Sequence, residues 1–151
     1  MEPTLYIWVI DDNPENIAMI ERSFPPPIQT SHALQSFLQA RAALAHFDLL
    51  MTTAPERLPD FILLDYFLDR MYGHEVLDHL LERYRTSGLP RAIIIAHSSL
   101  AQANALLVER GADCALEKIK GQAQSQAVAF AFRTPEAIRW FKQHRSPMPT
   151  P

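Results

Sequence analysis

Residues 60–80 read DFILLDYFLDRMYGHEVLDHL, and two patterns lie within this stretch. The first is the continuous apolar run Phe61–Leu64, which ends abruptly at Asp65. A short apolar run of this kind is typical of a strand that is buried on both faces, as in a parallel sheet. The second pattern follows Gly73, because apolar side chains recur with helical spacing over residues 74–84. The stretch therefore predicts a buried strand followed by a helix that covers it.

The same unit recurs along the chain. Leu5–Ile10 is a second apolar run, and it ends at an acidic pair formed by Asp11 and Asp12. The other strands that we expect are residues 28–33, 92–96 and 112–117. The other helices that we expect are residues 14–24, 36–51 and 100–110, and a last helix that starts at Thr134. Strands that alternate with helices predict an α/β fold, with a doubly wound, five-stranded parallel sheet and helices on both faces.

Residues 120–133 do not fit this alternation. Residues 120–126 are polar and indicate a loop, whereas residues 127–132 (AVAFAF) predict a strand or a buried coil. We therefore expect an altered segment before the last helix, which begins after Thr134 as its N-cap.

Length, charge and cysteine content narrow the classes of function. The 151 residues fit one domain, which we expect to span residues 1–145, followed by a disordered, proline-rich tail at residues 146–151. A net charge of −3 argues against a nucleic-acid partner. No apolar stretch approaches the roughly 20 residues that cross a bilayer, so no membrane partner is expected. The single cysteine, Cys114, cannot form an internal disulfide, which favours a cytoplasmic location.

Polar side chains follow most of the predicted strands at the point where each strand ends. Asp11 and Asp12 follow the first strand, Asp65 the third and Ser98 the fourth, and Lys118 ends the fifth. The carboxyl ends of parallel strands meet at one edge of a sheet, which is where ligands bind in such folds. We therefore expect these five side chains to be neighbours in space.

The chemistry of this set is coherent. Crowded carboxylates repel one another, and a divalent cation that prefers hard oxygen ligands, such as Mg²⁺, relieves that repulsion. A carboxylate can attack phosphorus and hold it as an acyl phosphate. A cation and a lysine neutralise the charge on the transferred oxygens, and a serine hydroxyl donates a hydrogen bond to them.

Three fragments carry a resemblance to a known family. They are IWVIDDN at residues 7–13, the stretch at residues 60–80 quoted above, and GADCALEK at residues 111–118. Together they resemble the response-regulator receiver domains of two-component signalling, over residues 5–118 and loosely into the last helix. The resemblance implies a flavodoxin-like sheet with the strand order 2-1-3-4-5 and Mg²⁺ as the cofactor.

The resemblance also implies roles for individual residues. Asp65 would be the phosphoacceptor, and Lys118 would pair with the phosphate. Asp11, Asp12 and Asp65 would hold the metal together with the backbone carbonyl of Phe67. The implied phosphodonor is a histidine kinase or a phosphotransfer protein.

Some positions depart from the family pattern. Asp69 stands where the family usually has proline, and Ile119 stands where proline usually follows the lysine. Ala115 occupies the position of an aromatic residue that often reports the active state. These departures, with the long segment at residues 120–133, indicate that the partner-binding face is remodelled.

The switch hydroxyl of the family has two alignments in this chain. Counting back from Gly111 without gaps gives Ala96, which has no hydroxyl. Aligning the end of the fourth strand gives Ser98, which we prefer because the predicted strand then ends beside a hydroxyl. Ser98 and its neighbour Ser99 also precede a helix, so one of them could cap that helix as well as bind phosphate.

Three hypotheses of function follow. The favoured one is a stand-alone receiver that switches a protein-binding surface when Asp65 is phosphorylated, with a downstream partner that the sequence does not identify. The alternative is a pseudo-receiver that binds proteins independently of phosphorylation. The third is a phosphatase of the haloacid-dehalogenase type, which needs a second aspartate where this chain has Phe67. We therefore expect no enzyme activity beyond slow self-dephosphorylation.

Overall fold

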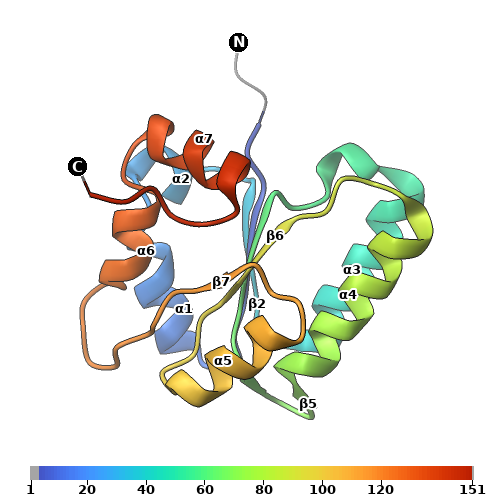
Figure 1. Cartoon of the computed structure of the whole chain (residues 1–151), viewed down its shortest axis with the longest axis horizontal. Helices are drawn as coiled ribbons and strands as arrows, with labels where there is room; N and C mark the ends of the chain where they lie inside the picture. Colours follow the sequence, from blue (N-terminus) through green and yellow to red (C-terminus); the bar gives the residue numbers. More distant parts are fainter. Residues whose placement is uncertain (1–3, 151) are drawn as a thin grey trace.

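The computed structural model describes residues 4–150 as a five-stranded parallel sheet enclosed by helices (Figure 1). Residues 1–3 of the expected domain and Pro151 of the expected tail lie outside the described residues. The strands of the sheet are β1 (Ile7–Ile10), β2 (Leu34–Phe37), β3 (Phe61–Leu64), β6 (Ile93–Ala96) and β7 (Cys114–Ala115). They lie in the order β2-β1-β3-β6-β7, which is the order 2-1-3-4-5 of the predicted strands. The predicted flavodoxin-like fold is confirmed.

Helices connect the strands, and a small hairpin follows β3. The hairpin pairs β4 (Phe67–Leu68) with β5 (Met71–Tyr72). The α-helices are α1 (Pro14–Glu21), α2 (Pro26–Gln29), α3 (Ala40–Thr53), α4 (Gly73–Ser87), α5 (Ala101–Glu109), α6 (Gln126–Ala131) and α7 (Pro135–His144). A 3₁₀ turn, η1 (Pro55–Arg57), follows α3.

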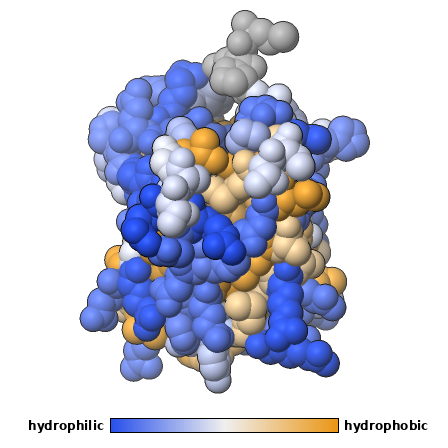
Figure 2. All heavy atoms as spheres, turned by 90° about the vertical axis from the view of Figure 1, so that its right-hand side faces the viewer, coloured by the Kyte–Doolittle hydropathy of each residue, from blue (hydrophilic) through white to orange (hydrophobic). Residues whose placement is uncertain are grey.

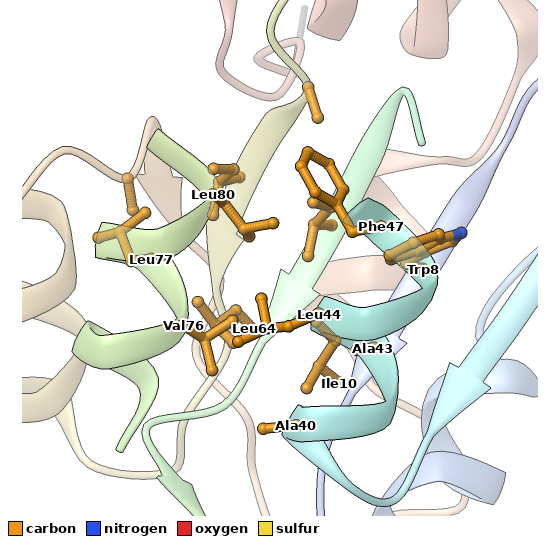
Figure 3. Packing of buried hydrophobic residues seen from close by; sticks show 14 of the residues in the cluster. Trp8, Ile10, Ala40, Ala43, Leu44, Phe47, Leu64, Val76, Leu77 and Leu80 are labelled. Atoms are coloured by element: carbon orange, nitrogen blue, oxygen red, sulfur yellow. The ribbon is translucent and has the colours of Figure 1, made fainter. Parts of the chain in front are cut away.

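Alternation along each central strand divides the core into two layers. Trp8 and Ile10 of β1 face α3, α4 and α5, whereas Ile7 and Val9 face α1, α6 and α7. Figure 3 shows the first layer, in which side chains of α3 and α4 pack over the strands. The four residues of each central strand are buried, which explains why these strands appear in the sequence as continuous apolar runs.

The second strand does not lie at the predicted residues 28–33. The consecutive prolines at residues 25–27 start the short helix α2, because proline suits the first turn of a helix, and β2 begins only at Leu34. The following helix consequently starts at Ala40 and not at Ser36. As an edge strand, β2 is only partly buried, so its apolar pattern is weak.

The segment at residues 127–132 lies in the helix α6 (Gln126–Ala131) and its C-cap Phe132, and not in the predicted strand or coil. Ser125 caps α6 by accepting a hydrogen bond from the Val128 backbone N–H at 3.5 Å. Val128, Ala131 and Phe132 then fall on one helical face and are buried beside α1 and α7. The alternating letters of AVAFAF therefore reflect a short helix in which small alanines separate the residues that pack.

A buried carboxylate ties the end of α7 to the sheet. Asp113 accepts hydrogen bonds from Arg91 at 2.7 Å, from Arg145 at 2.6 Å and from the Ile94 backbone N–H at 2.8 Å. Arg145 also donates to the Ala92 carbonyl at 2.8 Å. Arg145 is thus a structural anchor at the end of α7.

Among the helices of residues 4–150, none combines the length and the apolar character that crossing a bilayer demands. Figure 2 views the molecule from the side on which α3 and α4 lie, and hydrophilic side chains cover much of that face around a narrower apolar strip. The described part of the tail, residues 146–150, forms no helix or strand.

Two phenylalanines of the altered segment give a matched test of the role of α6. The Phe132 ring is fully buried against the rings of Phe24 and Phe61, with centroids 5.0 and 4.9 Å away. We expect Phe132→Ala to lower the free energy of unfolding by about 3–5 kcal/mol. Phe130 is 37% exposed and lies under Arg133, so Phe130→Ala should cost less than about 1 kcal/mol. Urea denaturation measures the free energy of unfolding of both variants. A loss for Phe132→Ala as small as that for Phe130→Ala would mean that α6 is not part of the core.

Candidate functional site

The register of the sheet brings the candidate side chains to one edge. Ile10 pairs with Leu64, and Leu64 pairs with Ala96, so the next residues along each strand lie side by side. Those residues are Asp11, Asp65 and His97. This edge, at the carboxyl ends of the strands, is the lower one in Figure 1. The predicted convergence of the first and third strand ends is present.

Three carboxylates form a cluster at this edge. One oxygen each of Asp11, Asp12 and Asp65 lies within 4.8 Å of the others. Asp11 is buried, and its Oδ1 accepts hydrogen bonds from the Asn13 backbone N–H at 3.0 Å and from the Asn16 side-chain amide at 3.4 Å. Asp12 is exposed. Three carboxylate oxygens from two loops, one of them open to solvent, are a donor set that fits Mg²⁺.

Lys118 places a buried positive charge among these carboxylates. Its Nζ lies 2.5 Å from Asp11 Oδ2 and 3.4 Å from Asp65 Oδ2, and its side chain is almost fully buried. A buried ammonium is tolerated only when it is paired, and Asp11 is the partner within hydrogen-bond distance. Lys118 is therefore held closer to Asp11 than to Asp65.

The environment shifts the pKa of two of the aspartates upward. Burial raises the pKa of Asp65 to about 6, because Asp11 adds to the effect of burial and Lys118 only partly opposes it. The pKa of Asp12 is also raised, by burial first and then by the charges of Asp11 and Asp69. Burial is the main cause of both shifts, and the neighbouring carboxylates add to it, so a cation bound here would lower the cost of ionising these groups.

The cluster opens into a depression of about 290 Å³. It is lined by Asp12, Asn13, Asn16, Asp65, Phe67, Ser98, Ser99, Leu100, Lys118 and Lys120. Six of the seven residues singled out from the sequence line it, and Asp11 lies buried behind Lys118.

The two alignments of the switch hydroxyl differ in position. Ala96 is fully buried in the core, whereas Ser98 lines the depression together with Ser99. The Ser98 hydroxyl accepts a hydrogen bond from the Leu100 backbone N–H at 3.2 Å, which leaves its own hydrogen available. Asn104 fixes the backbone of Ser98 on both sides, accepting from its N–H at 2.8 Å and donating to its carbonyl at 2.9 Å. Of the two alignments, the one that gives Ser98 therefore places a hydroxyl in the depression that Asp65 lines.

The position eight residues after Asp65 has space only for a glycine, Gly73. Its backbone N–H donates to the Tyr66 carbonyl at 2.6 Å. A Cβ at this position would lie 2.4 Å from the Asp65 carbonyl oxygen and 2.9 Å from the Tyr66 Cα. Both neighbours are backbone atoms, so any other residue would displace the loop that carries Asp65.

Sequence reasoning missed His97 and Asn104. His97 lies beside Asp65 in the register, but its Nδ1 donates to the Leu116 carbonyl at 2.5 Å, and burial lowers its pKa to about 4. Asn104 holds Ser98 as described above. The sequence could have indicated Asn104, because it is a polar residue on the apolar face of the predicted helix. No pattern in the sequence indicates the orientation of the His97 ring.

The raised pKa of Asp65 predicts how the free energy of unfolding depends on pH. Its folded pKa of about 6 exceeds the ordinary value of 3.8, so the folded state favours the protonated carboxyl. That favourable contribution is present at low pH and is lost as the pH rises through about 6. We expect Asp65→Asn, in EDTA at about pH 8, to raise the free energy of unfolding by about 2 kcal/mol. Urea denaturation at several pH values measures this.

The gain should shrink as the pH falls from about 6 to about 4, where wild-type Asp65 is itself protonated. Asp78→Asn is the control, because Asp78 lies on α4 in an exposed ion pair with Arg110. A gain for Asp65→Asn that is independent of pH would contradict the raised pKa of Asp65.

The similarity of this chain to known proteins lies in its structure. No protein-family model matches the sequence, and no curated protein matches it. Solved structures do match. The receiver domain of the histidine kinase CKI1 from Arabidopsis thaliana, as a D1050A mutant, is 18% identical with a TM-score of 0.66, covering 92% of this chain and 90% of that chain.

Two further structures are similar to this chain. The CKI1 receiver domain complexed with Mg²⁺ is 21% identical with a TM-score of 0.60, covering 75% of this chain and 82% of that chain. The phosphorylated cyanobacterial phytochrome response regulator RcpA is 18% identical with a TM-score of 0.63, covering 97% of this chain and 99% of that chain. The fold of this chain is therefore the fold of the receiver domains found in histidine kinases and response regulators.

Proposed function

We propose that this protein is a receiver that accepts a phosphoryl group on Asp65 from a histidine kinase or a phosphotransfer protein. The observation that carries the proposal is the single depression that Asp65, Asp12, Ser98 and Lys118 share. An acceptor carboxylate, a cation-binding carboxylate, a hydroxyl donor and a lysine are the parts that phosphoryl transfer to an aspartate needs. The receiver fold of the chain supports the same assignment.

The residues of the chain have distinct roles in this proposal. An oxygen of Asp65 attacks the phosphorus of a phosphohistidine, the P–N bond breaks, and the donor imidazole keeps the bonding electrons and takes a proton. Lys118 and the hydroxyl of Ser98 or Ser99 donate hydrogen bonds to the transferred oxygens. A Mg²⁺ ion held by Asp11, Asp12, Asp65 and the Phe67 carbonyl would supply neutralising charge to the same oxygens.

The position of Lys118 suggests how the signal spreads. Phosphorylation replaces the single charge of the Asp65 carboxylate with an acyl phosphate that carries about 1.5 to 2 negative charges, so Lys118 is expected to shift from Asp11 toward the phosphoryl group. The Lys118 backbone N–H donates to the Ser98 carbonyl at 3.1 Å, so the two segments are linked. The shift would therefore move the chain after β6 together with the chain after β7, and with them a surface for a downstream protein.

The proposal includes a cellular compartment, a class of partner and an activity. The free Cys114 fits a reducing, cytoplasmic compartment. The protein would act by binding a protein partner and not nucleic acid or membrane. It would not turn over a substrate, apart from slow hydrolysis of its own acyl phosphate.

Beryllofluoride with Mg²⁺, which mimics a phosphoryl group on aspartate, tests the acceptor role. In wild type we expect shifts of the backbone amide NMR signals of Ser98, Ser99 and Lys118 that require both reagents. Asp65→Asn should abolish them, because the fluoride adduct needs the carboxylate oxygen. Asp78→Asn, a matched change on the exposed face of α4, should retain them. An unchanged wild-type spectrum with the fold intact would favour a pseudo-receiver that binds its partner constitutively.

The lifetime of the acyl phosphate provides a second test of the proposed function. Phe67 and Leu100 line the depression and are 49% and 50% exposed, so two apolar side chains stand where water must approach. Neither can orient a water molecule, which predicts a long-lived phosphoryl group. Phe67→Asn or Phe67→Glu should speed the loss of ³²P-phosphate several-fold, because each supplies a polar atom there.

The control for this test is Leu38→Asn, which changes an exposed apolar residue that does not line the depression. It should leave the hydrolysis rate at the wild-type value. Equal rates for the wild type and both Phe67 variants would show that this side chain does not limit access of water.

A further inference from the structure

One rung of the hydrogen-bond ladder between the ends of β6 and β7 is made by side chains. In a parallel pair, the two strands donate to each other in turn at even spacing. Beyond the strand ends this order continues, because Leu116 N–H donates to the Ala96 carbonyl at 2.9 Å and Lys118 N–H donates to the Ser98 carbonyl at 3.1 Å. The rung between these two would join the Ser98 N–H to the Leu116 carbonyl.

Both backbone groups of this rung have a side chain as their partner. The Leu116 carbonyl accepts a hydrogen bond from His97 Nδ1 at 2.5 Å, and the Ser98 N–H donates to Asn104 Oδ1 at 2.8 Å. The imidazole thus replaces the Ser98 N–H as donor, and the Asn104 amide replaces the Leu116 carbonyl as acceptor. His97 and Asn104 are both buried, so the exchange leaves no backbone group of the rung unpaired in the interior.

The Asn104 side chain holds Ser98 outside the ladder. Its Nδ2 also donates to the Ser98 carbonyl at 2.9 Å, so one amide binds both backbone groups of that residue. Asn104 belongs to α5, which the chain enters at the lower edge of the sheet after it leaves β6 (Figure 1). Ser98 is therefore fixed against α5, and there it lines the depression that contains Asp65.

We propose that Asn104 and His97 are positioning residues, which hold the Ser98 hydroxyl where it can donate a hydrogen bond to a phosphoryl group on Asp65. This inference rests on the proposed function, and it selects Ser98 over Ser99 as the donor. His97 acts by keeping the Leu116 carbonyl occupied, so that the Ser98 N–H stays with Asn104.

Ser98 is held at three points before a phosphoryl group arrives. Its N–H and its carbonyl bind Asn104, and its hydroxyl oxygen accepts from the Leu100 N–H at 3.2 Å. The hydroxyl hydrogen is left available, because a hydroxyl both accepts and donates. A donor that is fixed in advance loses little conformational freedom on binding, which strengthens its interaction with a charged group.

The test is a double-mutant cycle that uses beryllofluoride with Mg²⁺ as the probe and ¹⁹F NMR to measure its affinity. Ser98→Ala should weaken beryllofluoride binding about tenfold or more, because it removes one hydrogen bond to a charged group. Asn104→Leu should also weaken binding, because Ser98 can then rejoin the ladder. In the double variant, Asn104→Leu should add no more than about a twofold loss, since the hydroxyl through which Asn104 acts is already absent.

Further variants separate positioning from stability. His97→Leu removes the donor to Leu116, whereas His97→Asn retains a side-chain N–H at the position of Nδ1. We expect His97→Asn to keep more of the affinity for beryllofluoride than His97→Leu does. Gln102→Leu makes the same amide-to-leucine change on the exposed side of α5, and it should bind as the wild type does. Urea denaturation measures the free energy of unfolding of each variant, and affinities that simply follow it would overturn the proposal.

Failure of this inference differs from failure of the proposed function. If beryllofluoride binds the wild type and Asn104→Leu equally well, the positioning role is wrong and the receiver function remains. Losses that add fully in the double variant would also overturn the inference, because Asn104 would then act through a group other than the Ser98 hydroxyl. If beryllofluoride does not bind the wild type, the proposed function fails, and the inference fails with it.

Discussion

The buried ion cluster of Lys118 with Asp11 and Asp65 is the constraint on which the rest of the structure depends. One positive charge and two carboxylates are held almost out of solvent, with Nζ 2.5 Å and 3.4 Å from the two partners. Such a cluster is stable only while its geometry is kept, since an unpaired buried charge costs several kcal/mol. The partners come from the ends of β1 and β3 and from the chain after β7. The parallel register of the sheet is therefore what keeps the charges together.

The apolar layers on each side of the sheet maintain that register. Every residue of β1, β3 and β6 is buried, and alternate residues contact opposite layers, so a slip by one residue would exchange the two cores. The altered segment contributes to one layer, because α6 packs Val128 and Phe132 beside α1 and α7. Its first turn is also tied to α1, since the Ser125 backbone N–H donates to the Ser23 hydroxyl at 2.7 Å. The extra residues thus extend the core, and they change the surface that α1 and α7 offer to a partner.

The sequence predicted the central strands well and the peripheral elements poorly, for a physical reason. Strands buried on both faces must be continuously apolar, so β1, β3 and β6 are visible directly. The edge strand β2 is buried less, and its position depends on how far the helical turn at Pro26 extends. The assignment of residues 127–132 failed because a six-residue helix is too short for its period to be distinguished from alternation. Side chains placed by strand ends, such as Asp65, were predictable, whereas His97 depended on a rotamer that only packing determines.

The orientation of His97 accounts for the position of the hydroxyl at the site. By register His97, and not Ser98, stands beside Asp65, yet the ring turns away to donate to the Leu116 carbonyl. The hydrogen bond fastens the end of β6 to the segment that carries Lys118. The residue that follows then bends away from the strand, where Asn104 holds its backbone, and this leaves a hydroxyl facing the depression. A bulky residue at the strand end is thus compatible with the proposed phosphoryl chemistry, because the next residue would supply the donor. The same bond joins the strand beside Asp65 to the segment that ends in Lys118, so the two segments are fixed relative to each other.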